Sequence, residues 1–214
     1  MKKYIIQIAV IIAIFFSNSI AQNQIKLAPS VGIFIYNSEN PLKITENSNY
    51  LLNYGFEASY INQTLLNLKF QIDYSYIYAS NNGALEFVRT SGIDIGTYYV
   101  DASLSFHSID ILLKNKLSEN FGYGIGPSFS IVNRSIFYDE ESFEDRLSSF
   151  NVGLSATIDM LTPISDNSPD WNFYGGIKLR YLYGLFYDEN GRDLSNYNQH
   201  FLTLNLIIGL SYNL

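Results

Sequence analysis

The last fourteen residues, FLTLNLIIGLSYNL (201–214), alternate between two kinds of side chain. Successive side chains of a β-strand point to opposite faces, so this stretch has one apolar face and one small, polar face. The apolar face consists of Leu204, Leu206, Ile208, Leu210, Tyr212 and Leu214. On the other face, Asn205, Gly209, Ser211 and Asn213 are interrupted by a single apolar residue, Ile207. The pattern predicts the closing strand of a transmembrane β-barrel, with its apolar face toward lipid.

The same alternation recurs in seven earlier segments of the chain. They are residues 25–36, 50–60, 66–78, 97–117, 121–131, 149–160 and 171–185. We therefore predict an all-β fold, an eight-stranded antiparallel up-and-down transmembrane β-barrel of the outer-membrane type. The longer polar connections, residues 37–49, 79–96, 137–148 and 186–198, would lie outside the cell if the N-terminus is periplasmic.

One predicted strand, residues 97–117, changes phase along its length. Its apolar residues have even numbers as far as Phe106 and odd numbers from Ile109 onward. A β-bulge near His107 and Ser108 would absorb the extra residue and keep both apolar sets on the lipid side. The segment is also too long for one membrane crossing, so we expect its upper part to project beyond the membrane as a hairpin arm.

The N-terminus predicts export. Lys2 and Lys3 precede an apolar run, residues 5–16, and small residues surround a cleavage point after Ala21. This run has about 12 residues against the roughly 20 that a transmembrane helix needs, which favours a signal peptide over a retained anchor. We assign residues 1–21 to the signal peptide and residues 22–214 to the barrel domain.

The composition excludes several functional classes. Removal of residues 1–21 takes away two lysines and no acidic residue, so the formal net charge changes from −7 to −9. Such an acidic chain is not expected to bind nucleic acid. The absence of cysteine excludes disulfides and thiol chemistry. A hydrophobic content of 47%, with 18 Tyr and 15 Phe, suits an outer-membrane protein whose apolar residues occupy alternate positions.

A soluble eight-stranded barrel of the lipocalin type is the main architectural alternative, because alternation does not say which face points inward. The non-apolar face is rich in glycine, serine and charge, and the aromatic residues concentrate near strand ends. Both features favour the membrane barrel, in which aromatic girdles lie at the two interfaces.

A group of charged residues falls on the predicted inner face. They are Glu57, Lys69, Asp73, Asp101, Lys114, Asp159, Lys178 and Arg180. The interior of an eight-stranded barrel holds little more than side chains, so we expect these residues to form a network of ion pairs that plugs the lumen. A narrow path for ions or water is the alternative interpretation.

Catalytic and metal-binding patterns are weak. Asp101, Ser105 and His107 share one strand face, but alternate residues lie about 6.6 Å apart, so sequence neighbourhood alone does not make a hydrolytic triad. The acidic segment that contains Glu144 and Asp145 could bridge a divalent cation to lipopolysaccharide, although a solvated surface loop is the simpler interpretation. We expect no enzyme activity, no cofactor and no metal centre.

Two short motifs carry a family resemblance. The run Ile109-Asp110-Ile111-Leu112-Leu113-Lys114 is similar to an Ile-Pro-Leu-Leu-Leu-Lys run, and Gly122-Tyr123-Gly124-Ile125-Gly126-Pro127 is similar to a Gly-x-Gly-Pro strand. Both occur in the PorT-like group of the small outer-membrane β-barrel family, which this chain resembles. The resemblance implies a barrel and no catalytic residues; Asp110 replaces the usual proline and Leu214 the more frequent terminal Phe.

Together these observations predict an integral outer-membrane barrel with a structural or cell-surface interaction role. The alternatives are a narrow solute or ion channel, a secretion-accessory barrel, and a lipid A-modifying hydrolase. The expected partners are outer-membrane lipid and lipopolysaccharide, the barrel-assembly machinery acting on the C-terminal strand, and an extracellular or envelope protein bound by the four longer loops.

Overall fold

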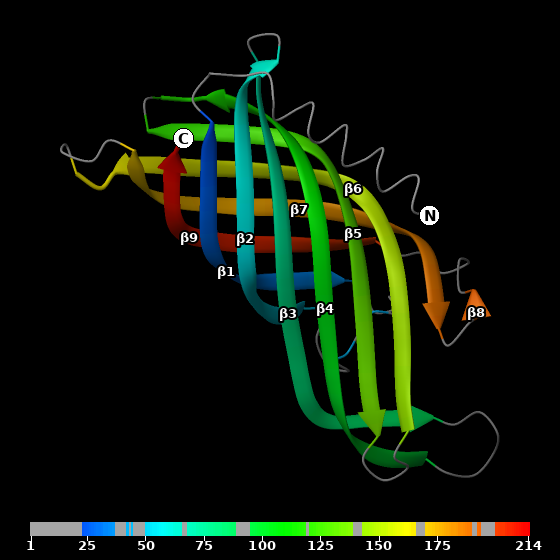
Figure 1. Ribbon diagram of the computed structural model, residues 1–214. Coiled ribbons are helices and arrows are strands. Elements are labelled where there is room, and N and C mark those ends of the chain that lie inside the picture. The colour runs from blue at the N-terminus through cyan, green and yellow to red at the C-terminus, as the bar shows by residue number, and fades with distance from the viewer. Residues whose placement is uncertain are drawn as a thin grey trace.

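Eight long antiparallel strands close into a barrel in the computed structural model (Figure 1). The structure describes residues 23–36, 42, 44, 50–65, 68–88, 95–118, 120–138, 143–165, 170–189, 192–193 and 200–214. The predicted signal peptide lies outside these residues. Among them, no helix is long and apolar enough to cross a membrane.

The strands follow one another around the barrel in chain order. They are β1 (Gln24–Tyr36), β2 (Tyr50–Leu65), β3 (Leu68–Val88), β4 (Ile95–Lys116), β5 (Phe121–Tyr138), β6 (Phe143–Pro163), β7 (Trp171–Glu189) and β9 (His200–Asn213). A two-residue strand, β8 (Arg192–Asp193), pairs only with the end of β7. The predicted eight-stranded up-and-down barrel is confirmed.

The closing strand pairs on both sides. β9 pairs with β1 from Gln24–Asn213 to Tyr36–Phe201, and with β7 from Trp171–Tyr212 to Tyr183–His200. This is the closure predicted from the last fourteen residues. Because each of the eight long strands has two paired neighbours, the part of the wall that they share satisfies its backbone groups without water, as a bilayer requires.

The exterior of the barrel is apolar over most of its height. In β9 the side chains of Leu204, Leu206, Ile208 and Leu210 are exposed, as is that of Leu214 directly after the strand, while Asn205 and Ser211 are buried inside. Tyr212 lies on the same outer face and is partly buried. A continuous apolar exterior of this kind is stable only against lipid.

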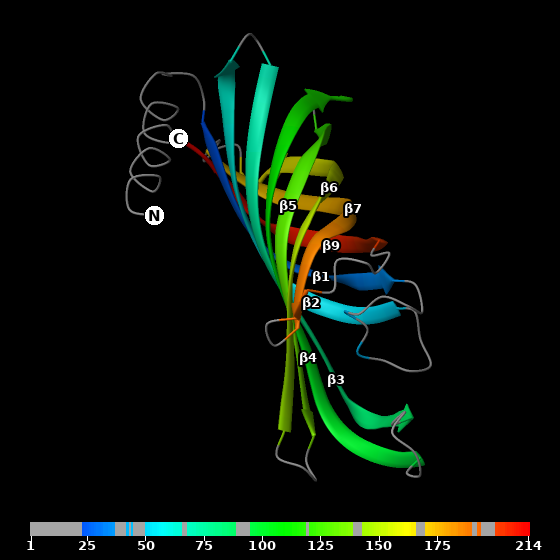
Figure 2. The same cartoon turned by 90° about the vertical axis from the view of Figure 1, so that its right-hand side faces the viewer.

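The wall is uneven at one end of the barrel, which we call the hairpin end; the opposite end, with residues 23 and 214, is the terminal end. β3 and β4 pair as far as Val88–Ile95 and extend well beyond the ends of β1 and β2 (Figures 1 and 2). The prediction of a projecting arm is therefore right. The prediction of a loop over residues 79–96 is wrong for most of its length, because the two strands continue to pair.

The other predicted loops are also partly strand. Residues 137–138 and 143–148 belong to the β5–β6 hairpin, and β7 runs on to Glu189. Residues 139–142 lie outside the described part of the chain. Of residues 37–49 the structure describes only Leu42 and Ile44, and both are buried.

β4 keeps a single phase throughout, so the predicted bulge near His107 and Ser108 is wrong. Its pairing with β3 is continuous from Lys69–Lys114 to Val88–Ile95. The even-numbered residues of β4 face the interior wherever its side chains are described, so Leu104 and Phe106 point inward and not toward lipid. The register shifts that do occur lie between β6 and β7 at Phe150 and Asn151, and between β2 and β3 near Leu65.

Glycine allows neighbouring strands to approach closely at the inner face. A Cβ atom at Gly126 would overlap the backbone carbonyl oxygen of Ile111 in β4. At Gly124, a Cβ atom would instead meet the side chain of Lys114 at 2.6 Å. The first glycine permits the strong curvature of a small barrel, and the second leaves lumen space for a long side chain.

We predict that Gly126→Ala lowers the free energy of unfolding of the barrel by about 1–3 kcal/mol, the usual effect of overpacking. The reason is that the backbone must move to admit the new methyl group. Gly175→Ala is the matched control, since the nearest atom to its Cβ would be 3.9 Å away. Urea unfolding in detergent micelles, followed by heat-modifiable gel mobility, measures both variants. Equal stability of the two variants would refute the role assigned to Gly126.

Candidate functional site: the charged lumen

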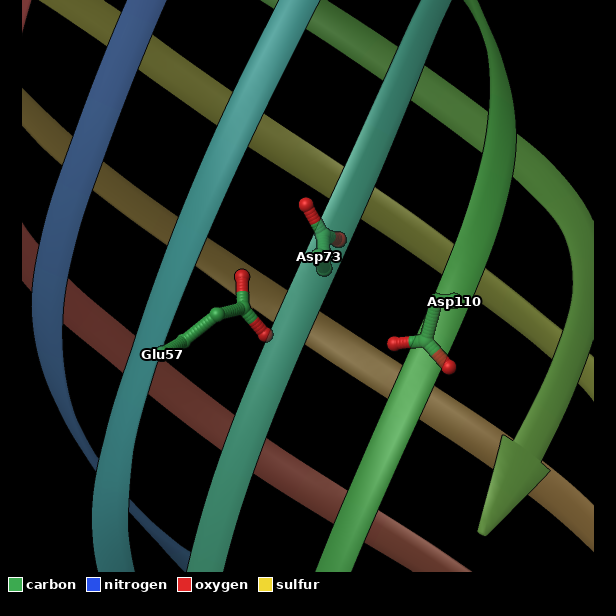
Figure 3. A group of neighbouring side chains, drawn as sticks. All are labelled: Glu57, Asp73 and Asp110. Atoms are coloured by element: carbon green, nitrogen blue, oxygen red, sulfur yellow. The ribbon is translucent and has the colours of Figure 1, made fainter. Parts of the chain in front are cut away.

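A cluster of five charged side chains, the central charge cluster, crosses the middle of the lumen. Glu57, Asp73 and Asp110 project from the adjacent strands β2, β3 and β4, and their carboxylates gather in Figure 3. Lys178 and Arg180 reach them from β7 on the opposite wall. All five are at most 2% exposed.

Lys178 occupies the position between the three carboxylates. Its Nζ atom lies 2.5 Å from Asp73 Oδ2 and 3.1 Å from Asp110 Oδ2, and it also pairs with Glu57. The three carboxylates lie within 4.8 Å of one another, a spacing that could suit a metal ion. The ammonium group of Lys178 already fills the place of a cation, so the arrangement is complete without a metal.

Arg180 holds the second half of the central charge cluster. Its Nη2 atom donates to Asp110 Oδ2 at 2.8 Å and to Ser75 Oγ at 2.5 Å, and its Nε atom donates to Asp110 Oδ2 at 3.0 Å. Ser128 also donates to Asp110, at 2.6 Å. Buried charges are tolerated when they are paired and hydrogen-bonded in this way.

A smaller group, the terminal-end charge cluster, consists of Lys26, Lys114 and Asp159. Lys26 Nζ lies 3.3 Å from Asp159 Oδ2, and Lys114 pairs with the same oxygen. Lys26 also lies 4.1 Å from the ring centroid of Tyr174. The two clusters together contain four carboxylates and four basic groups, so their formal charges cancel.

The structure brings together most of the charged residues predicted to face the lumen. Glu57, Asp73, Lys178 and Arg180 meet in the central cluster, whereas Lys114 and Asp159 meet at the terminal end. Lys69 lies on the inner face of β3, opposite Lys114 in register and half-buried at the end of the strand.

Asp101 was predicted to face the lumen, and this prediction is wrong. Its side chain is exposed on the outside of β4, because the expected bulge does not exist and odd-numbered residues of β4 face outward. Sequence reasoning also missed Lys26 and Asp110. Asp110 stands within an apolar run and was not counted, although the predicted outward positions of Ile109 and Ile111 imply that it points inward; pairing with β3 bears out this phase.

Toward the hairpin end the interior becomes apolar. Phe34, Phe106 and Phe201 pack edge to face, with ring centroids 5.8 Å and 6.2 Å apart. We call the surrounding group the hairpin-end apolar cluster; its members are Phe34, Tyr36, Leu42, Ile44, Leu51, Ile77, Ala79, Ala102, Leu104, Phe106, Val132, Ile136, Leu147, Leu182 and Phe201. Asn81 donates from Nδ2 to the carbonyl oxygen of Ile44 at 3.0 Å, which ties the segment between β1 and β2 to β3.

Polarity therefore inverts along the barrel. In β4, Ile109, Ile111 and Leu113 are exposed on the outside, while nearer the hairpin end Asp101 occupies the outer face and Phe106 the inner face. A barrel wall with an apolar exterior is stable in lipid, whereas a wall with a polar exterior and an apolar interior is stable in water. The strands thus continue past the membrane as a water-exposed wall.

Comparison with solved structures agrees with this architecture. A major outer membrane protein from Thermus thermophilus superposes with a TM-score of 0.51 at 13% identity, covering 89% of this chain and 99% of that one. Neisserial surface protein A superposes with a TM-score of 0.50 at 11% identity, covering 90% and 97%. No protein-family model and no curated protein matches the sequence.

The chain has the fold of the small outer-membrane β-barrels. At these identities the likeness concerns fold alone. Together with the apolar exterior, it agrees with the outer-membrane location predicted from the sequence.

We predict that Lys178→Met destabilises the barrel by about 3–5 kcal/mol, the usual cost of breaking a buried ion pair, because three carboxylates would remain without their central cation. Adding Asp73→Asn should recover part of the loss, since it removes one of the unpaired charges. Lys69→Met, at the end of β3, is the matched control. Urea midpoints in micelles measure the series; a Lys178→Met barrel as stable as the Lys69→Met barrel would contradict the prediction.

Proposed function

We propose that this protein is a non-conducting outer-membrane barrel that presents the projecting wall at its hairpin end to an extracellular or envelope protein. The observation that carries the proposal is the inverted polarity of this wall, which extends β-structure beyond the lipid with a polar outer surface. An outer-membrane protein needs no such extension to span the bilayer, for which about 9–11 residues per strand suffice.

The lumen argues against the channel alternative. A solute would have to displace the central charge cluster, whose cations pair across the lumen with carboxylates on the opposite wall. It would then meet Phe34, Phe106 and Phe201, which pack against one another. Desolvating an ion in this second layer is costly, so the two layers form independent barriers.

The β3–β4 arm offers backbone edges to a partner. β2 pairs with β3 only as far as Tyr54–Tyr78, and β5 pairs with β4 only from Val100–Tyr138 onward. Beyond these pairs, the described pairing of the arm is between its own two strands, up to Val88–Ile95. Unpaired strand edges are templates for an additional strand, so an extended segment of another protein is the kind of partner that fits.

The hydrolase alternative has little support in the geometry. Asp101, Ser105 and His107 share the outer face of β4, but the Nδ1 atom of His107 lies 2.9 Å from the hydroxyl of Tyr74. A triad needs a carboxylate at this nitrogen to orient the ring. Membership of the PorT-like group, with an accessory role in secretion, is a second proposal that rests on the sequence motifs alone.

We predict that the purified protein shows no stable unitary current in planar lipid bilayers. The closed lumen is the reason, and a conducting barrel reconstituted in parallel is the positive control. Reproducible single-channel steps that vanish on heat denaturation of the sample would overturn the non-conducting assignment.

We also predict that replacing residues 84–99 by an Asn-Gly turn abolishes capture of the partner while leaving the barrel folded, because the β4–β5 ladder begins only at Val100. Surface biotinylation and crosslinking on intact cells, with mass spectrometry, identify proteins that depend on the arm. Heat-modifiable mobility confirms folding. An unchanged crosslinking pattern in the folded variant would exclude the arm as the contact surface.

A further inference from the structure

The chain contains two histidines, and both lie on the outer surface of the barrel wall. His107 in β4 is opposite Tyr76 of β3, and His200 in β9 is opposite Tyr183 of β7. The two strand pairs are separated by β5 and β6 on one side and by β1 and β2 on the other. The histidines therefore lie on opposite sides of the barrel.

The first histidine packs between two tyrosines of the neighbouring strand. The hydroxyl of Tyr74 lies 2.9 Å from His107 Nδ1, and the ring of Tyr76 lies 4.9 Å from the imidazole between centroids.

The second histidine repeats this geometry. The hydroxyl of Tyr181 lies 2.6 Å from His200 Nδ1, and the Tyr183 ring is again 4.9 Å away. In each case the first tyrosine of a Tyr-x-Tyr sequence bonds the histidine and the second packs on it. We call these two groups the Tyr-His clusters.

Both Tyr-His clusters lie at the boundary between lipid and water. On the outer face of β4, His107 separates the exposed side chains of Ile109 and Ile111 from Ser105 and Asp101. The polarity of the wall changes at this residue, as it would at the level of the lipid headgroups.

The length of the β7–β9 ladder independently indicates that His200 lies at the level of the lipid headgroups. It begins at Trp171–Tyr212, whose rings pack 4.9 Å apart, and ends at Tyr183–His200. Twelve positions separate the two ends, roughly 40 Å along a strand and about 28 Å along the barrel axis at a tilt near 45°. That height matches the roughly 25 Å apolar band of such barrels plus its aromatic girdles, so the second Tyr-His cluster also lies at headgroup level.

We propose that the two Tyr-His clusters bind the phosphate groups of outer-leaflet lipid headgroups. In the tautomer in which the tyrosine hydroxyl donates to Nδ1, the hydrogen of the imidazole lies on Nε2. The fixed ring then presents an N–H donor at the depth of the headgroups, where a phosphate oxygen accepts. The paired tyrosines fix the orientation of the ring and therefore the direction of this N–H donor. In metal sites, a hydrogen bond to the second ring nitrogen orients a histidine ligand in the same way.

The proposal rests on the proposed membrane embedding and not on the proposed partner surface. The acidic residues near the hairpin end have the same sign of charge as lipid phosphate and repel it. Two local donor sites on opposite walls would fix the depth and tilt of the barrel in spite of this repulsion.

Two histidines give two imidazole signals, which makes a direct test practical. The probe is the ¹⁵N-histidine-labelled full barrel in phosphate-free alkyl maltoside micelles that contain increasing fractions of phosphorylated lipid A. Dephosphorylated lipid A, and inorganic phosphate added to lipid A-free micelles, serve as separate arms. We expect both Nε2 signals to shift and saturate with phosphorylated lipid A, and to shift in neither control arm.

Variants assign each site. Tyr74→Phe should raise the half-saturating lipid fraction for His107 about fivefold, the effect of losing one ordinary hydrogen bond, without changing His200. Tyr181→Phe should give the reverse result. Tyr212→Phe, in the aromatic pair at the terminal end, should change neither signal.

Equal shifts with phosphorylated and dephosphorylated lipid A would show a general interfacial environment and would overturn the proposal. So would equal shifts with inorganic phosphate, or no shift at all. Loss of partner crosslinking in the arm-deleted barrel has no bearing on these signals, so failure of the partner proposal and failure of the lipid proposal are distinguishable. If one tyrosine variant does not fold, the other still tests its own cluster.

Discussion

The pairing of Lys178 with three carboxylates is the interaction on which the interior depends. It links β7 to β2, β3 and β4 across the lumen, so the wall is braced by ion pairs as well as by its backbone ladder. Ion pairs across the lumen are stable only if each charge has a partner of opposite charge, because the lumen of an eight-stranded barrel has little room for water. The equal numbers of acidic and basic groups in the two charge clusters meet this requirement. The glycines of β5 contribute by leaving space for Lys114.

The hairpin-end apolar cluster solves a different problem. Beyond the lipid, water surrounds the wall, and a polar lumen there would leave the strands without a hydrophobic core. The aromatic and aliphatic side chains of this cluster supply one, and Leu42 and Ile44 add to it from the segment between β1 and β2. The chain thus combines a membrane barrel with a polar interior and a short water-exposed barrel with an apolar interior. A single set of strands passes through both.

Alternation of side chains predicted the eight strands, the outward face of β9 and its closure against β1, because these regions lie within lipid and follow one rule of polarity. The same rule failed in β4. There Phe106 was assigned to lipid and Asp101 to the lumen, since apolar residues were expected to face outward along the whole strand. Pairing with β3 fixes the phase, and no pattern within β4 itself carries that information. Asp110 was missed for a different reason: the predicted phase of Ile109 and Ile111 placed it inward, but it stands within an apolar run and was not counted among the lumen charges. The continued strand pairing of residues 79–88 and 143–148 was missed because polar strands in water resemble loops in composition.

The asymmetry of the rim decides what kind of surface a partner would meet. The ladder of β9 ends at Tyr183–His200, at the level of the lipid headgroups, and β1 ends at Tyr36. The wall from β3 to β7 continues past that level, so it stands on one side of the barrel mouth (Figure 2). The apolar cluster lies inside its described part. A partner of the proposed kind would meet this sheet, whose described outer face carries Asp101 and Ser105. A sheet of this kind loses little conformational entropy on binding, and backbone pairing along its edge tolerates many partner sequences.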